Sequence, residues 1–189
     1  VDPNVFFANA EEDLSPIAES LIVLPNPVQP HSEGSVMLTS GDPLAPPDIR
    51  MNYYDDPHDM KVMIATARRA LDVIEQMRAA HQIGPVLVAP ALAAKHGYTL
   101  GDPLSDELLE DMARHYSFTV YHLTSTCRIG SVVDPELRVL GVDGLRVADA
   151  SVMPNVVSGN TNAASIMIGE KAAEMIARAH GVGLAEFVG

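Results

Sequence analysis

The strongest pattern in this sequence is a helical repeat of apolar residues over residues 161–180, and it constrains the fold more than any other feature. The apolar face recurs at 3.6-residue spacing and consists of Ala164, Ile168, Ala172, Met175 and Ala179. His180-Gly181 follows as the expected end of the helix. A helix with one apolar face must bury that face against other residues. The chain has 189 residues, of which 47% are hydrophobic, and this is enough to form a core. We therefore expect a folded chain of one domain or slightly more.

Two further helices are predicted, over residues 57–80 and 105–116. Asp56 is the expected N-cap of the first helix, and Pro57 occupies its first helical position. Ser105 is the expected N-cap of the second helix, which begins with acidic residues. The segment between the two helices, residues 84–104, is rich in Gly and Pro and is predicted to be a loop.

Strand signals are short and scattered. The apolar run over residues 20–24 fits a buried strand, and residues 34–40 alternate as a half-buried strand would. A third short strand is predicted over residues 145–149, directly before the polar loop that leads into the C-terminal helix. The sequence contains no internal repeat.

Charge and composition exclude several classes of protein. With 12 Lys and Arg against 25 Asp and Glu, the net charge is −13 and there is no basic patch, so we expect neither nucleic acid nor an anionic membrane as a partner. No apolar run approaches the roughly 20 residues that a membrane span requires. A single cysteine, Cys127, rules out an internal disulfide and fits a reducing compartment. We therefore expect a cytoplasmic protein.

General catalytic motifs are absent from the sequence. It contains no GxGxxG, GxxxxGK[ST], HExxH, CxxC or GxSxG. Its seven histidines have no metal-ligand spacing, so we expect no metal. His58 lies among acidic residues at a predicted helix start, and a solvated helix N-terminus explains that cluster better than a cation site.

Two segments combine polar residues in a way that suits a binding site, residues 121–130 and 144–163. The second runs from a predicted strand through a polar loop into a helix, so that the backbone N–H groups of Thr161 and Asn162 face any ligand with negative charge. A structural interpretation is also open for each polar residue. Asn160 can serve as an N-cap, His122 as a half-buried histidine with its own partner, and Asp149 as a turn former.

These segments resemble the glucose–methanol–choline (GMC) oxidoreductase family, in particular the C-terminal half of its members. Residues 121–130 are similar to the family stretch Y-H-x-x-G-T-C-R-M-G, with Ser125 in place of the glycine and Ile129 in place of the methionine. The resemblance covers residues 25–180. Its other segments are Asn52–Pro57, Val133–Val139, Gly144–Ser151, Ser158–Ala163 and Met167–Ala173.

The resemblance implies an α+β fold in two parts. Residues 1–125 would form part of a substrate-binding domain, an antiparallel sheet with flanking helices. Residues 126–189 would complete a Rossmann-like FAD-binding domain with its C-terminal strand and helix.

The resemblance further implies that FAD oxidises an alcohol to a carbonyl by accepting a hydride at flavin N5. His122 matches the family's catalytic base, a task that suits imidazole because its ordinary pKa of about 6.5 is close to working pH. Asn160 matches the second catalytic position, where its amide can donate a hydrogen bond to the developing alkoxide. The residues implied to contact FAD are Asp149, Ala150, Asn160, Thr161 and Asn162.

The family's GxGxxG segment, which seats the FAD pyrophosphate, is not in this sequence. Together with a first residue that is Val1 rather than Met, this leads us to expect one piece of a split or processed enzyme. Its partners would then be an N-terminal polypeptide that bears GxGxxG and a small-molecule alcohol. Two alternatives remain: a hydroxynitrile lyase on the same scaffold, or a flavin-less interaction or regulatory domain.

Overall fold

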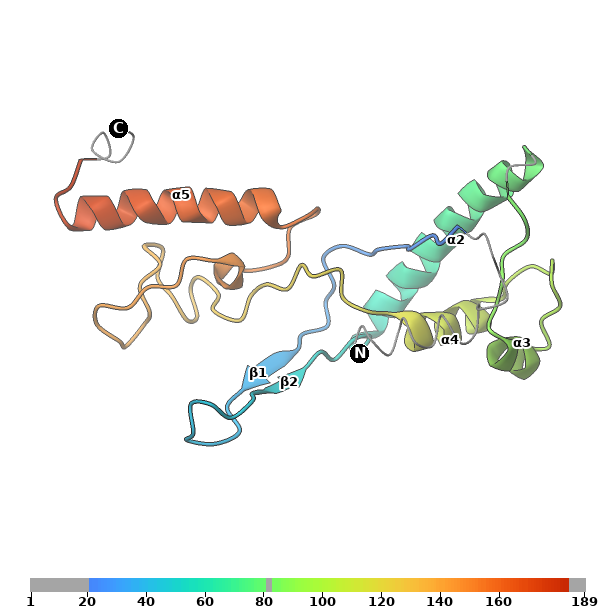
Figure 1. Cartoon of the computed structure of the whole chain (residues 1–189), viewed down its shortest axis with the longest axis horizontal. Coiled ribbons are helices and arrows are strands. Elements are labelled where there is room, and N and C mark those ends of the chain that lie inside the picture. The colour runs from blue at the N-terminus through green and yellow to red at the C-terminus, as the bar shows by residue number, and fades with distance from the viewer. Residues whose placement is uncertain (1–20, 81–82, 184–189) are drawn as a thin grey trace. The chain divides into compact units, whose positions relative to one another are not determined.

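A computed structural model describes residues 21–80 and 83–183 of the chain (Figure 1). The chain divides into two compact units. Within the described residues, the first unit contains residues 21–34 and 51–120, and the second contains residues 35–50 and 121–183. The predicted division into residues 1–125 and 126–189 remains a prediction, because compact units are not by themselves a substrate domain or a cofactor domain.

The described residues of the first unit form three helices. α2 spans Pro57–Ala79, α3 spans Pro90–His96 and α4 spans Asp106–Tyr116. Both predicted N-caps are confirmed. A carboxylate oxygen of Asp56 accepts the N–H of His58 at 2.8 Å, and Oγ of Ser105 accepts the N–H of Leu108 at 3.2 Å.

The core of the first unit lies where α2 and α4 meet. Leu104, Leu108 and Leu109 are buried there, and side chains of α2 such as Ile64 and Leu71 pack against them. Arg68 reinforces the contact at its edge. Its guanidinium donates to the carbonyl of Leu104 at 2.6 Å and pairs with the carboxylate of Asp106.

The prediction of a loop over residues 84–104 is wrong at its centre, where α3 forms. Pro90 occupies the first turn, where a missing N–H costs the helix nothing. Gly97 ends the helix in the left-handed conformation at φ 63°. The same Pro and Gly that suggested a loop are therefore the start and stop signals of a seven-residue helix.

The second unit contains the only sheet in the described part of the chain, an antiparallel hairpin of β1 (Ser35–Met37) and β2 (Asp48–Arg50). The α+β class and the antiparallel pairing are thus confirmed, and over residues 21–80 and 83–183 the sheet consists of these two strands. Leu21–Leu24, predicted to lie in a buried strand, are exposed and form no strand; Ser20 lies outside the described residues. A lone strand has no neighbour to satisfy its backbone groups.

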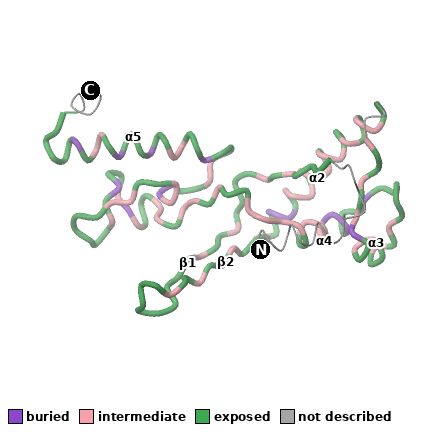
Figure 2. Tube along the Cα trace, in the orientation of Figure 1, coloured by how far each residue is buried: buried purple, intermediate pink, exposed green. Residues whose placement is uncertain are grey.

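The C-terminal helix and a single 3₁₀ turn organise the rest of the second unit. α5 spans Asn162–Ala179 and η1 spans Ala150–Val152. Figure 2 shows buried positions recurring along α5 and in the loops beside it. The core consists of Val133, Leu137, Val152, Met153, Ile168 and Ala172, with Ala164 and Met175 packed against it. The predicted apolar face of α5 is confirmed at all of these helical positions, whereas Ala179 is exposed.

The predicted strand over residues 145–149 does not form. In its place is an isolated antiparallel bridge between Arg138 and Arg146. Backbone hydrogen bonds link this stretch to residues 133–139. The N–H of Val139 donates to the carbonyl of Leu145 at 2.9 Å, and the N–H of Val147 donates to the carbonyl of Leu137 at 3.1 Å. A strand of a Rossmann-like sheet requires parallel neighbours, and the described part of the chain offers none.

Candidate functional site

Backbone hydrogen bonds join the two segments that the sequence singled out. The N–H of Cys127 donates to the carbonyl of Ser151 at 2.9 Å, and the N–H of Ile129 donates to that of Val152 at 3.0 Å. η1 in turn contacts α5. Residues 127–129 are therefore fixed to the turn that packs against the C-terminal helix. Cys127 is half-buried.

His122 lies against the start of α5. Its Nδ1 is 3.1 Å from Oγ1 of Thr161, a hydrogen bond between residues 39 positions apart. His122 is half-buried, and Thr161 is only 8% exposed. Thr161 directly follows Asn160, so the structure brings the two predicted catalytic residues into one neighbourhood within the second unit.

Thr161 occupies the N-cap position of α5 without capping it. Its backbone is helical, with φ −76° and ψ −7°, rather than extended as in most capping residues. Its side chain makes no cap hydrogen bond, and Oγ1 lies 3.1 Å from Nδ1 of His122. The first turn of α5 contains no acidic residue. The first N–H groups of the helix and their partial positive charge are therefore neither capped nor neutralised from within the helix.

Asn160 and Asn162 flank Thr161, and both are exposed. Asn162 is the first residue of α5. The alternative in which Asn160 is the N-cap is wrong, since that position belongs to Thr161. The carboxamide of Asn160 is thus not committed to capping the helix.

Asp149 and Ala150 lie at the start of η1. Oδ1 of the exposed Asp149 accepts the N–H of Ser151 at 2.7 Å, which makes this residue the N-cap of η1 and a turn former. Ala150 is half-buried and packs against the core of the second unit. Their expected contact with FAD stays a prediction, and the structure adds a local role for each.

Two residues of the 121–130 segment have backbone conformations that side chains rarely adopt. Tyr121 has φ 64° and Ser125 has φ 76°. They stand on either side of His122. Strained backbone concentrates at sites where a side chain must be held in one orientation.

The acidic cluster near His58 has a structural role that the sequence did not reveal. Asp59 is buried, and its two carboxylate oxygens accept the N–H groups of His31 and Ser32 at 2.7 and 2.8 Å. The ring of His31 stacks on that of His58 at 4.2 Å. Asp59 thereby ties residues 31–32 to the first turn of α2. Among the described residues, no group of three or more His, Cys, Asp or Glu is placed to hold a metal ion.

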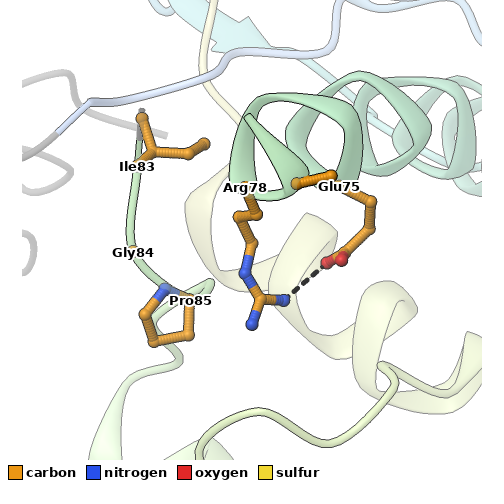
Figure 3. Close-up of a pocket in the computed structure, with 6 residues that line it drawn as sticks. Glu75, Arg78, Ile83, Gly84 and Pro85 are labelled. Atoms are coloured by element: carbon orange, nitrogen blue, oxygen red, sulfur yellow. Dashed lines mark hydrogen bonds and ion pairs between the residues drawn. The ribbon is translucent and has the colours of Figure 1, made fainter. Parts of the chain in front are cut away.

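A pocket of about 410 Å³ lies beside the C-terminal end of α2 (Figure 3). Arg78 and Glu75 form an ion pair at its edge, 2.7 Å apart. None of the predicted site residues lines this pocket. Across residues 21–80 and 83–183, the structure contains no helix with the length and apolar character to cross a membrane.

The sequence profile of the GMC oxidoreductases matches residues 30–169. An alcohol dehydrogenase (acceptor) of Pseudomonas putida is 43% identical over 79% of this chain and 26% of its own length. Choline oxidase of Arthrobacter globiformis is 42% identical over 80% of this chain and 28% of its own length.

Solved structures give the same result. An FAD-dependent oxidoreductase from Chaetomium thermophilum superposes with a TM-score of 0.71 at 29% identity, over 82% of this chain and 26% of that one. A fungal aryl-alcohol oxidase superposes with a TM-score of 0.64 at 31% identity, over 80% of this chain and 24% of that one. The chain thus spans about a quarter of the length of these relatives. It belongs to the GMC oxidoreductase family and corresponds to the family's C-terminal region.

Proposed function

We propose that this chain is the C-terminal part of an FAD-dependent alcohol oxidoreductase, with His122 as the base and Asn160 as the residue that orients the substrate. The observation that carries the proposal is the hydrogen bond of His122 Nδ1 to Thr161, the residue next to Asn160. This hydrogen bond supports a site at the N-terminal end of α5 to which His122 and Asn160, from distant parts of the sequence, both contribute.

The geometry of His122 suits proton transfer. Its Nδ1 is engaged by Thr161, so Nε2 is the ring nitrogen left to meet a substrate. A neutral imidazole in this arrangement accepts the hydroxyl proton of an alcohol while the carbon loses its hydride. The remaining oxygen becomes the carbonyl oxygen of the product.

Asn160 supports the same step without exchanging a proton. Its amide nitrogen can donate a hydrogen bond to the alcohol oxygen as negative charge develops there. The exposure of Asn160 leaves its side chain accessible to a ligand. His122 and Asn160 would therefore act on the same oxygen from two directions.

The N-terminal end of α5 fits the anionic part of FAD. Its first turn has no side-chain cap and no acidic residue, so the N–H groups near Thr161 and Asn162 are suited to an electron-rich oxygen or nitrogen. Asp149 and Ala150, at the start of η1, are the residues that we assign to the ribityl and pyrophosphate portion. When bound, FAD supplies the acceptor for the substrate hydride.

The rest of the enzyme would come from an N-terminal polypeptide that bears GxGxxG. The chain covers 26% and 28% of the two relatives above, so most of the family's length lies outside it. Large apolar side chains of its hairpin loop, Leu38 and Leu44, are 88% and 89% exposed. Apolar side chains exposed to this degree support the proposal that another polypeptide covers this part of the chain.

The test is to purify the enzyme that contains this chain and to treat it with primary alcohols under anaerobic conditions. We expect a flavin absorbance spectrum that bleaches on reduction, together with the matching aldehyde. Cleavage of a cyanohydrin without bleaching would favour a hydroxynitrile lyase instead. A colourless preparation that forms no carbonyl product would favour an interaction domain, and either result would contradict the proposal.

A further inference from the structure

Thr161 is placed in a way that helix formation alone does not explain. Threonine at an N-cap normally accepts an N–H from the first turn of its own helix, and this cap contributes about 1 kcal/mol. Here the side chain does not cap α5 and its Oγ1 faces His122 instead. A departure from the usual capping pattern at a residue predicted to contact FAD points to function.

The position of the Thr161 hydroxyl is fixed from several sides. The residue is buried, and its carbonyl accepts both the N–H and the Oγ–H of Ser165 at 2.8 Å. Threonine is also stiff at χ1 because its Cβ is branched. The Thr161 backbone is thus held in place, and burial and the branched Cβ restrict the positions open to the hydroxyl that contacts His122.

The direction of this hydrogen bond decides which nitrogen of His122 is available as a base. If Nδ1–H donates to Thr161, Nε2 holds a lone pair and can accept a proton. If the hydroxyl donates to Nδ1, Nε2 carries the hydrogen and the neutral ring has no acceptor left for the substrate. Only the first arrangement agrees with His122 as the base.

We propose that Thr161 is a positioning residue: its Oγ1 accepts Nδ1–H of His122 and holds the imidazole in the tautomer whose Nε2 takes the hydroxyl proton of the alcohol. This inference rests on the function proposed above, because it requires His122 to act as the base. It extends that function to a residue that acts through His122 rather than on the substrate.

The test compares Thr161→Val with Thr161→Ser in the flavin-loaded enzyme. Valine keeps the branched shape but removes the hydroxyl, whereas serine keeps a hydroxyl at the same atom. We expect the rate of flavin reduction at saturating alcohol to fall about tenfold in Thr161→Val, the equivalent of one hydrogen bond. Thr161→Ser should stay within about twofold of the wild type. Thr66→Val, which removes a helical hydroxyl of α2 in the first unit, is the matched control and should be unchanged.

A second readout does not depend on activity. In enzyme labelled with ¹⁵N in its histidine rings, NMR should show His122 protonated at Nδ1 in the wild type and in Thr161→Ser. In Thr161→Val the proton should shift toward Nε2. Protonation at Nε2 in the wild type, or an unchanged rate in Thr161→Val, would overturn the inference. If His122→Gln is fully active the proposed function itself fails, and the NMR result still tells which nitrogen carries the proton.

Discussion

Ser125 shows how a single residue departs from the family pattern at a structural cost. It replaces the glycine of the family stretch and has φ 76°, in the left-handed region where a side chain costs about 1–2 kcal/mol. Glycine adopts this conformation freely but loses about 0.5–1 kcal/mol through the greater freedom of its unfolded chain. The cost of the left-handed conformation at Ser125 is therefore larger than the entropic cost of a glycine there.

Ser125→Gly should therefore stabilise the protein, by about 0.5–1 kcal/mol in free energy of unfolding. Urea denaturation followed by circular dichroism measures the difference. Ser158→Gly is the matched control, because Ser158 is exposed and has no positive φ. The control should lose stability. An equal loss in both variants would show that the conformation at Ser125 is not strained.

Asp59 is the residue whose titration should be visible in stability. Burial raises the pKa of its carboxyl, but hydrogen bonds from the Ser32 hydroxyl and from the N–H groups of His31 and Ser32 outweigh burial, so the pKa lies below the ordinary 3.8. A depressed pKa stabilises the fold when the group is ionised. That contribution is complete well above pH 3.8 and is lost as the pH falls through the lower folded-state pKa.

Asp59→Asn should cost about 1–3 kcal/mol near neutral pH, because the charged hydrogen bonds to residues 31–32 are lost. Urea unfolding of both proteins across the acid range should show this difference shrinking below the ordinary carboxyl pKa of about 3.8. Asp55→Asn, at an exposed neighbour, is the control and should change little. A difference that is constant with pH would refute the ionic role of Asp59.

At the scale of elements, α5 connects the core of the second unit to the site. Ile168 is 8% exposed and belongs to that core, whereas Ile166 is 59% exposed on the same helix. Ile168→Ala should cost about 2–4 kcal/mol through lost burial and a cavity. Ile166→Ala should cost less than about 0.5 kcal/mol. Thermal unfolding of the two variants measures the contrast, and equal losses would contradict the packing of α5.

α2, α4 and α5 were predictable from the sequence because their signals are local, whereas α3 forms in a segment that was predicted to be a loop. Asp56, Pro57 and Ser105 mark helix starts by their own chemistry, and the apolar face of α5 is visible in its spacing. Of the predicted strands, the one over residues 34–40 forms as β1, where β2 completes its hydrogen bonds. The others were wrong or lie partly outside the described residues, since a strand forms only where a neighbour completes its hydrogen bonds. The stretch over residues 145–149 is apolar enough for a strand but finds only a bridge at Arg146.

The site was predictable in part. The resemblance singled out His122 and Asn160, and the structure brings His122 to the residue after Asn160. The hydrogen bond of Thr161 was not predictable, because a threonine before a helix signals a cap and nothing in its sequence setting shows that the hydroxyl turns away. The hydrogen bonds that Asp59 accepts from residues 31–32 were not predictable either, because those residues lie far upstream of α2 in the sequence.

For the whole molecule, one chemical claim connects these observations. In a chain that spans about a quarter of the length of its GMC relatives, His122 lies against the N-terminal end of α5. Under the proposed function, the remainder of the enzyme would supply the principal seat of FAD. Under the proposed function, the His122 imidazole acts as the base in the assembled enzyme.

The most direct measurement is the anaerobic rate of flavin reduction by a primary alcohol in wild type and His122→Gln enzyme, followed by stopped-flow absorbance. Glutamine retains polarity but cannot accept the hydroxyl proton as a base. The account predicts a fall of about 100-fold or more in the reduction rate, with flavin still bound. A wild-type rate in His122→Gln enzyme that retains its flavin would contradict it.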